Sequence, residues 1–183
     1  LTLALGTLRA TPLEVATGFA AFANGGFKVD PYFIDRIEDA NGKVVYRAEP
    51  KEVCVLCNAP ATSHEAPTLD TPDSLQAAAS VRADLGLLPR KRVAERIISP
   101  QNAYIMDDIM ADVIRRGTGR RANVLSRSDI AGKTGTTNES KDAWFNGFNR
   151  DLVATVWVGY DQERSLGEGE EGSRTAVPIW VYF

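Results

Sequence analysis

The run Ala-Gly-Lys-Thr-Gly-Thr-Thr at residues 131–137 places the tightest limit on what this chain can fold into. A Gly-Lys-Thr triplet occurs in phosphate-binding loops, which also need a glycine five residues before it, a preceding strand and a following helix. Arg127 occupies the position of that glycine, and the residues after the triplet have the pattern of a strand. Since no helix N-terminus is available to cradle a phosphate, we exclude nucleotide binding and predict a strand at residues 130–137.

Two segments have the marked ends and the apolar spacing of packed helices. Residues 11–26 begin with Thr-Pro-Leu-Glu, a capping box with proline at the first helical position, and end at a Gly-Gly pair. A second helix is predicted from the Ser-Pro pair at residues 99–100 to Gly117. Its apolar residues repeat at helical spacing, so we expect a buried stripe formed by Ile105, Met106, Ile109, Met110, Val113 and Ile114.

Shorter runs have the character of strands. Residues 32–38 and 43–46 are predicted to form a hairpin through a tight Asn-Gly turn. Residues 143–148 and 152–160 form a second predicted hairpin, joined by Asn-Arg-Asp. The order of helix, hairpin, helix and three strands indicates an α+β fold, an antiparallel sheet packed with helices.

Composition divides the chain into three parts. Residues 1–48 and 93–183 are assigned to one domain, and residues 49–92 to an insert between its two halves. The insert is rich in Pro, Ala, Thr and charge without a sustained period, so it cannot bury enough apolar surface to offset its ordering entropy. We expect it to be partly disordered, with a short helix near residues 75–81.

The insert also holds both cysteines and the single histidine of the chain. Cys54, Cys57 and His64 supply at most three of the four N or S ligands of a structural zinc site, so we expect no metal. A redox Cys-x-x-Cys pair is expected at the start of a helix, whereas this pair lies in a proline-rich stretch. A local disulfide and two free thiols both remain open.

Charge and hydropathy limit the classes of partner. The net charge of −3 predicts no binding to nucleic acid, and the cluster of Arg116, Arg120 and Arg121 is interpreted as a solvated loop. No apolar run approaches the ~20 residues that span a bilayer. The chain starts at an apolar leucine and stops inside a predicted element at residues 176–183, so we expect it to be a fragment of a longer protein.

The Lys-Thr-Gly strand fits a serine acyl-transfer enzyme that acts on D-Ala-D-Ala peptides or β-lactams. Gly135 has no side chain to block a substrate lying along the strand, and Lys133 supplies positive charge. Thr134 and Thr136 offer hydroxyl groups to a carboxylate, and the N–H of Thr136 can donate to an oxyanion. Taken alone, the Lys-Thr-Gly triplet is weak evidence for such an enzyme, because a surface strand with a single lysine has the same pattern.

The flanking segments make the pattern specific, and together they resemble class A penicillin-binding proteins. The matching runs are Thr-Pro-Leu-Glu at 11–14, Phe-Ala-Asn-Gly-Gly at 22–26, Arg-Gly-Thr-Gly at 116–119, Gly-Lys-Thr-Gly-Thr-Thr-Asn at 132–138, Asp-Ala-Trp-Phe-Asn-Gly at 142–147, Val-Trp-Val-Gly-Tyr-Asp at 156–161 and Arg-Thr-Ala-Val-Pro-Ile-Trp at 174–180. The resemblance covers nearly the whole chain except residues 49–92.

This resemblance implies part of a β-lactamase/DD-transpeptidase-like domain. The family attacks D-Ala-D-Ala stem peptides with the serine of a Ser-x-x-Lys motif and also uses a Ser-x-Asn motif; both lie upstream of the matched region. No serine of this chain is followed by a lysine three residues on, so the chain alone is expected to be inactive. The residues that carry over are the catalytic pair Lys133 and Thr136 and the substrate-binding set Thr134, Gly135, Thr136, Thr137, Asn138 and Thr118. For Thr118 a place in the C-cap of the preceding helix remains open as the alternative.

The resemblance also implies the surroundings of the site. The expected partners are peptidoglycan stem peptides, β-lactam antibiotics as covalent inhibitors and the upstream part of the same protein, with no cofactor. The expected location is the periplasmic face of the bacterial inner membrane, held by an anchor outside this chain. Trp144 and Trp157 are expected in the core of the hairpin. A β-lactamase, a β-lactam-sensing receptor and a non-catalytic scaffold of the same fold remain open.

Overall fold

The computed structural model describes residues 9–54 and 92–183. The chain divides into two compact units, one made of Leu1–Lys28 with Ile97–Phe183 and the other of Val29–Arg96. The boundaries expected for the insert stay a prediction, since residues 55–91, and with them the helix expected at 75–81, lie outside the described residues.

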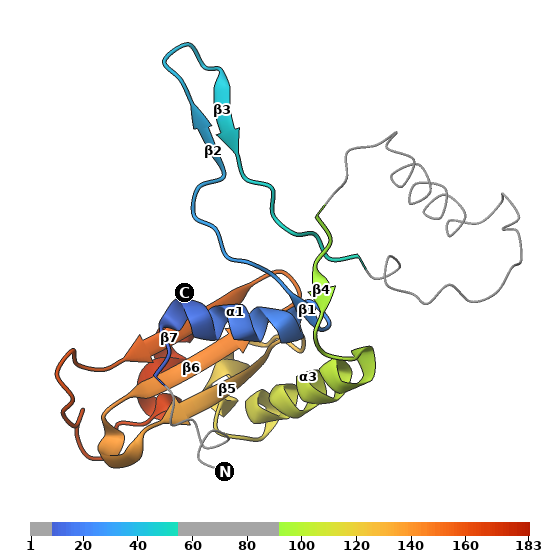
Figure 1. The fold of residues 1–183 in the computed structure, drawn as a ribbon. Coiled ribbons are helices and arrows are strands. Elements are labelled where there is room, and N and C mark those ends of the chain that lie inside the picture. Colours follow the sequence, from blue (N-terminus) through green and yellow to red (C-terminus); the bar gives the residue numbers. More distant parts are fainter. Residues whose placement is uncertain (1–8, 55–91) are drawn as a thin grey trace, which may run out of the picture. The chain divides into compact units, whose positions relative to one another are not determined.

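The first helix, α1, spans Pro12–Ala23, and its N-terminus is held by the capping box that the sequence predicts (Figure 1). The hydroxyl of Thr11 accepts from the N–H of Glu14, and the carboxylate of Glu14 accepts from the N–H of Thr11 at 2.8 Å. The helix ends at Asn24, followed by Gly25 at φ +80°, a left-handed conformation that glycine adopts without strain.

The second long helix, α3, spans Pro100–Arg115, and Ser99 caps its N-terminus by accepting from the N–H of Asn102. The prediction that its whole apolar stripe is core is wrong. Met110 and Ile114 are buried, but Ile105 and Ile109 are 51% and 53% exposed. Spacing alone predicts one apolar face, whereas the sheet covers only the part of it nearest β5.

Three strands form one antiparallel sheet in the order β5-β6-β7 (Figure 1). They span Ala131–Thr136, Ala143–Phe148 and Val153–Val158. Both pairings run in unbroken register, from Ala131 opposite Phe148 to Thr136 opposite Ala143 in the first pair. The predicted hairpin of the last two strands is therefore confirmed, and so is the α+β fold of helices packed on an antiparallel sheet.

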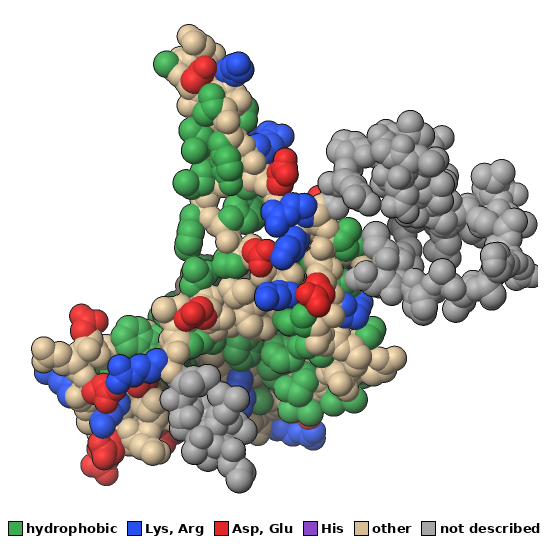
Figure 2. Space-filling model, in the orientation of Figure 1, with side chains coloured by type: hydrophobic (Ala, Val, Ile, Leu, Met, Phe, Trp, Pro, Cys, Tyr) green, Lys and Arg blue, Asp and Glu red, His purple; other side chains and the backbone are tan. Residues whose placement is uncertain are grey.

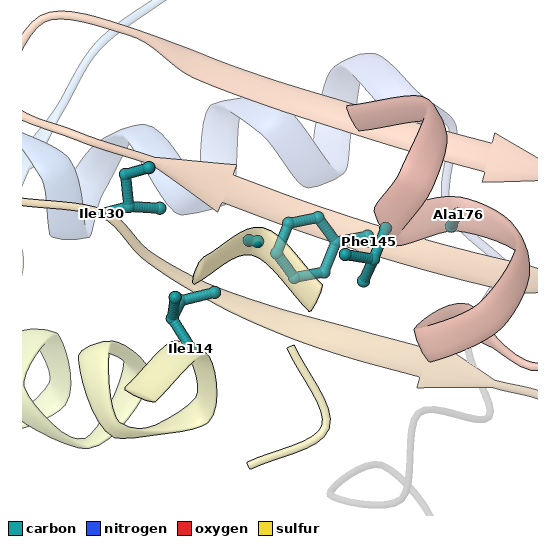
Figure 3. Close-up of a cluster of buried hydrophobic side chains, with 6 residues drawn as sticks. Ile114, Ile130, Phe145 and Ala176 are labelled. Carbon is teal, nitrogen blue, oxygen red and sulfur yellow. The ribbon is translucent and has the colours of Figure 1, made fainter. Parts of the chain in front are cut away.

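The sheet is covered on both faces. On one face Ile130 and Phe145 pack with Ile114 of α3 and with Ala176, in a cluster of six buried residues (Figure 3). On the other face Ala131 and Phe148 pack with Met110 and with aromatic residues of α1. Because adjacent residues of a strand point to opposite faces, Lys133 and Gly135 lie on the α1 side, and Thr134 and Thr136 on the other.

The last described segment covers the face that bears Phe145. A wide π-type turn, η4 (Gly172–Ala176), leads into the short helix α4 (Val177–Tyr182). Trp180 packs edge-on against Phe145, with ring centroids 5.2 Å apart, and its indole N–H donates to the carbonyl of Ala154. The element expected near residues 176–183 is thus a helix.

Outside the main sheet, β1 spans Phe27–Lys28 and β4 spans Glu95–Arg96. In the second unit, β2 (Arg36–Glu38) pairs with β3 (Val44–Arg47), which confirms the predicted hairpin. Its turn is wider than expected, because the carboxylate of Asp39 accepts from the N–H groups of Asn41 and Lys43 and organises a five-residue loop, 39–43.

The hairpin exposes apolar side chains along both strands (Figure 2). Ile37, Val44, Val45 and Tyr46 are all more than 40% exposed. Further along the chain Cys54 is disulfide-bonded, and the second cysteine, Cys57, lies outside the described residues.

Candidate functional site

The Lys-Thr-Gly segment lies on β5, an outer strand of the three-stranded sheet (Figure 1). Lys133 and Thr136 are exposed, whereas Thr134 and Gly135 are half-buried. After the strand the chain turns through η3 (Asn138–Ser140), where Glu139 is left-handed. No long helix follows, so the segment is a strand, as expected from the sequence, and does not have the setting of a phosphate loop.

The backbone of Thr136 directs its N–H group away from β6. In an antiparallel pair, opposed residues alternate between those that exchange backbone hydrogen bonds and those that do not. The N–H of Thr137 donates to the carbonyl of Asp142 at 3.1 Å. This bonded pair stands one step beyond the Thr136–Ala143 pair in an unbroken register. The N–H of Thr136 therefore points to the outer edge of β5.

Lys133 is held close to this edge. Its ammonium group donates to the carbonyl of Thr134 at 2.8 Å, which keeps the charge beside the strand. Across the pairing it stands opposite Asn146, a buried residue whose side-chain oxygen has no partner among the described residues. Lys133 makes no ion pair with any described residue, so its charge is free for an anionic ligand.

Thr118 reaches the strand from the loop that follows α3. Its hydroxyl oxygen lies 2.6 Å from that of Thr134, within hydrogen-bond distance. The N–H groups of Gly117 and Gly119 both donate to the carbonyl of Val113, so the chain folds tightly beneath the end of the helix. A Cβ at Gly117 would lie 2.8 Å from the backbone of Val113, so this close approach requires a glycine.

Thr136 is tied to the segment that precedes α4. Its hydroxyl accepts from the N–H of Gly172 at 3.1 Å, which leaves the hydroxyl proton free to be donated. A Cβ at Gly172 would lie 2.4 Å and 2.5 Å from the carbonyl oxygens of Trp144 and Gly135. Only a glycine lets this turn lie flat against the strand pair.

Asp142 joins the far end of β5 to β7. Its carboxylate accepts from the indole N–H of Trp157 at 2.8 Å and from the hydroxyl of Thr137 at 3.2 Å. The rings of Trp157 and Trp144 pack with centroids 6.1 Å apart, but Trp157 is 37% exposed and Trp144 half-buried. The expectation that both are core aromatics is therefore wrong; they form a surface pair next to the strand end.

The structure brings part of the predicted set together. Thr118, Thr134 and Thr136 present hydroxyls on one face of β5, while Lys133 lies on the other face beside the same edge. Thr137 is engaged with Asp142, and Asn138 starts η3. The described residues hold no His, Cys, Asp and Glu group that could bind a metal ion.

Two supporting residues were not singled out by sequence reasoning. Gly172 lies in a Gly/Glu-rich stretch that indicates only a loop, and nothing in it points to contact with β5. Asp142 begins the Asp-Ala-Trp-Phe-Asn-Gly run that carries part of the resemblance, but nothing in that run indicates its contact with Trp157. The role of Gly172 depends on its contact with Thr136, 36 residues away along the chain, and that of Asp142 on its contact with Trp157, 15 residues away.

Together these groups can hold an extended anionic acyl compound along β5. The ammonium group of Lys133 and the hydroxyls of Thr134 and Thr136 can bind a carboxylate, and the outward N–H of Thr136 can donate to a carbonyl oxygen that gains negative charge. The chain belongs to the family described as the penicillin binding protein transpeptidase domain, whose profile matches residues 1–177.

Two proteins that are similar to this chain in sequence are both named penicillin-binding protein 1A. The chain is 46% identical to penicillin-binding protein 1A of Pseudomonas aeruginosa, over 99% of this chain and 23% of that protein. It is 41% identical to penicillin-binding protein 1A of Neisseria gonorrhoeae, over 99% of this chain and 18% of that protein. The chain thus spans about a fifth of the length of these relatives.

Solved structures support the same fold. The crystal structure of penicillin-binding protein 1A from Haemophilus influenzae superposes with a TM-score of 0.77 at 38% identity, over 98% of this chain and 26% of that one. The D,D-transpeptidase domain of a peptidoglycan glycosyltransferase from Eggerthella lenta gives a TM-score of 0.59 at 24% identity, over 94% of this chain and 31% of that one, a likeness of fold alone. Among the described residues no helix is long and apolar enough to cross a membrane.

Proposed function

We propose that this chain forms one wall of the acyl-transfer site of a peptidoglycan DD-transpeptidase. The nucleophilic serine is expected in the part of the longer protein upstream of residue 1, which this chain does not contain. The observation that carries the proposal is the edge position of β5, with the N–H of Thr136 directed outward and the hydroxyls of Thr134 and Thr136 side by side on one face.

The reaction proceeds in two steps. The serine oxygen attacks the carbonyl carbon between the last two D-alanines, the C–N bond breaks, and the terminal D-alanine leaves with a proton on its amine. An amine of a neighbouring stem peptide then attacks the ester carbon, and the serine oxygen leaves and regains its proton. Each step passes through a tetrahedral oxyanion, which needs hydrogen-bond donors already in place.

This chain supplies binding and electrostatic groups for both steps. The N–H of Thr136 donates to the oxyanion, and a donor of this kind lowers the barrier by about 3 kcal/mol in other enzymes. The hydroxyls of Thr134 and Thr136 bind the terminal carboxylate of the donor peptide. Lys133 adds a positive charge near that carboxylate and near the serine. Gly135 leaves room for the peptide, and Thr137 and Asn138 border the strand end.

β-Lactams fit the same groups, because they too carry a carboxylate next to a reactive carbonyl. We therefore propose β-lactam antibiotics as covalent inhibitors, and stem peptides as substrates at the periplasmic face of the inner membrane. The name of the relatives, penicillin-binding protein 1A, supports the first proposal, and the description of the family as a transpeptidase domain supports a peptide substrate.

The test is covalent labelling of the full-length protein with a fluorescent penicillin. A stable adduct that runs with the protein on a denaturing gel is expected, and the Lys133→Ala variant should acylate about a hundredfold more slowly. The isolated 183-residue chain should not be labelled. Labelling of the isolated chain would mean that the nucleophile lies within it, and rapid loss of the adduct would indicate a β-lactamase.

A further inference from the structure

A row of three polar residues crosses the main sheet on the face that bears Lys133. Lys133 of β5 stands opposite Asn146 of β6, and Asn146 stands opposite Thr155 of β7. Residues that stand directly opposite each other in an antiparallel pair project from the same face of the sheet. The three side chains therefore lie in one line across β5, β6 and β7, and we call this line the polar row.

The polar row lies between two rows without charged residues. These flanking rows are Ala131, Phe148 and Val153 on one side, and Gly135, Trp144 and Trp157 on the other. The first of them belongs to the cluster that packs with the aromatic residues of α1. A polar group buried in such surroundings costs free energy unless it is hydrogen-bonded.

Two members of the polar row each carry an oxygen without a partner. Oδ1 of Asn146 and Oγ1 of Thr155 are buried and have no hydrogen-bond partner among the described residues. Asn146 as a whole is only 7% exposed. An orphaned buried acceptor costs more than an apolar group of the same shape, so an asparagine is unfavourable at this position unless a donor reaches its Oδ1.

Lys133 has donors to spare and stands next to this acceptor. Its ammonium group carries three N–H donors, and within the described residues it gives one, to the carbonyl of Thr134 at 2.8 Å. The Cβ atoms of directly opposite residues are about 4.5–5.5 Å apart, a distance that the four-carbon stem of a lysine spans. Nζ of Lys133 can therefore reach Oδ1 of Asn146 without a shift of the backbone.

We propose that Asn146 is a positioning residue for Lys133. Its Oδ1 accepts a hydrogen bond from the ammonium group, and its Nδ2 donates to Oγ1 of Thr155, so both orphaned oxygens gain a partner. An amide suits the middle of the row because it presents an acceptor to one neighbour and donors to the other. The proposal rests on the function proposed above and deepens it, since Asn146 acts on the substrate only through Lys133.

A neutral acceptor keeps the charge of Lys133 available. A carboxylate at residue 146 would hold the ammonium group more strongly, but it would also cancel the positive charge that attracts an anionic acyl donor. The amide oxygen of Asn146 restricts the exposed lysine side chain without neutralising it. Lys133 is thus held beside β5 instead of spreading over many rotamers in solvent.

The test measures the rate at which fluorescent penicillin acylates the full-length protein. Asn146→Leu keeps a similar size without an acceptor and should slow acylation about tenfold, the effect of one hydrogen bond from a charged donor. Asn146→Ser keeps an acceptor and should stay within about threefold of the wild type. Equal slowing by Asn146→Leu and Asn146→Ser would overturn the role of the acceptor, and so would a wild-type rate for Asn146→Leu.

A double-mutant cycle separates positioning from a purely structural role. Because Asn146 acts through Lys133, adding Asn146→Leu to Lys133→Ala should slow acylation no further than Lys133→Ala alone. A further loss of about tenfold in the double variant would show that Asn146 acts independently of Lys133, and the proposal would then be wrong.

Thr155→Val is the second variant, and it removes the hydroxyl while keeping the shape of a strand residue. It should slow acylation about threefold, and only when Lys133 is present. A wild-type rate for Thr155→Val would overturn the hydrogen bond between Asn146 and Thr155. Failure of the wild type to react with penicillin would instead overturn the proposed function.

The matched control is Val156→Ala, at the next residue of β7. Val156 projects from the opposite face of the sheet and packs against the cluster around Phe145. Val156→Ala should lower the thermal midpoint and leave the acylation rate unchanged. Slowing by Val156→Ala equal to that by Thr155→Val would assign both effects to lost stability and overturn the role of the polar row.

Discussion

The hydroxyl oxygens of Thr118 and Thr134 lie 2.6 Å apart, although 16 residues separate them along the chain. This contact fixes the loop after α3 against the strand that bears Lys133. One of the two hydroxyls donates to the other, which leaves a single proton for a ligand. Thr118 thus fixes where the hydroxyl of Thr134 lies beside the strand.

The first prediction concerns this pair. Thr118→Val keeps the shape of the side chain but removes the hydroxyl, at a cost of about 1 kcal/mol for the lost hydrogen bond. We expect acylation of the full-length protein by penicillin to slow about fivefold, because Thr134 loses its orientation. Thr118→Ser should retain near wild-type rates. Equal rates for Val and Ser would show that the pair does not orient Thr134.

The second prediction concerns the anchor at the end of β5. Asp142→Ala removes the acceptor for the indole N–H of Trp157 and for the hydroxyl of Thr137. Both donors are partly exposed and can turn to water, so the loss should be about 1 kcal/mol in the free energy of unfolding. Asp142→Asn keeps one acceptor oxygen and should lose less. Thermal unfolding of the two variants measures both losses of stability. A larger loss for Asp142→Asn than for Asp142→Ala would contradict the prediction.

The third prediction concerns Gly172. An added Cβ would lie 2.4 Å from the carbonyl oxygen of Trp144, and backbone cannot move aside as a flexible side chain can. Gly172→Ala should therefore lower the free energy of unfolding by about 1–3 kcal/mol. The control is Gly18→Ala within α1, where a Cβ meets nothing within 4 Å. That change should stabilise the protein by up to about 1 kcal/mol, because alanine favours helix.

The fourth prediction concerns pH. Burial raises the pKa of Asp107 on α3, and one of its carboxylate oxygens has no partner among the described residues. Since the folded pKa lies above the unfolded one, the free energy of unfolding is greatest below the unfolded pKa and falls as the pH rises through the folded pKa. At pH 7 the charged carboxylate therefore weakens the fold.

Asp107→Asn should raise the thermal midpoint at pH 7, by at most about 4 °C given the solvent screening of a half-exposed group. The gain should shrink as the pH falls toward the ordinary pKa of Asp, about 3.9. Midpoints measured from pH 7 to pH 4 provide the check. A gain that does not depend on pH would show that another property of the asparagine causes it.

Much of the fold was predictable because its signals are local. The capping box of α1, the cap of α3 and the three strands all follow from short patterns. The exposure of Ile105 and Ile109 was not predictable, since helical spacing defines a face without saying how much of it a neighbour covers. Trp157 differs from expectation for a related reason, because its indole N–H is satisfied by Asp142 at the surface.

The candidate site was predictable only in part. The Lys-Thr-Gly-Thr run identifies the strand, and the strand pattern implies which side chains share a face. The pairing of Thr118 with Thr134 and the contact of Gly172 with Thr136 depend on tertiary packing. No spacing along the chain encodes these contacts.

The most direct measurement is a crystal structure of the full-length protein acylated by a penicillin. The ester carbonyl oxygen should lie about 2.7–3.1 Å from the N atom of Thr136, with the carboxylate of the adduct on the hydroxyls of Thr134 and Thr136. An adduct attached elsewhere, or a β5 edge covered by another strand of the protein, would contradict the assignment of this strand as a wall of the acyl-transfer site.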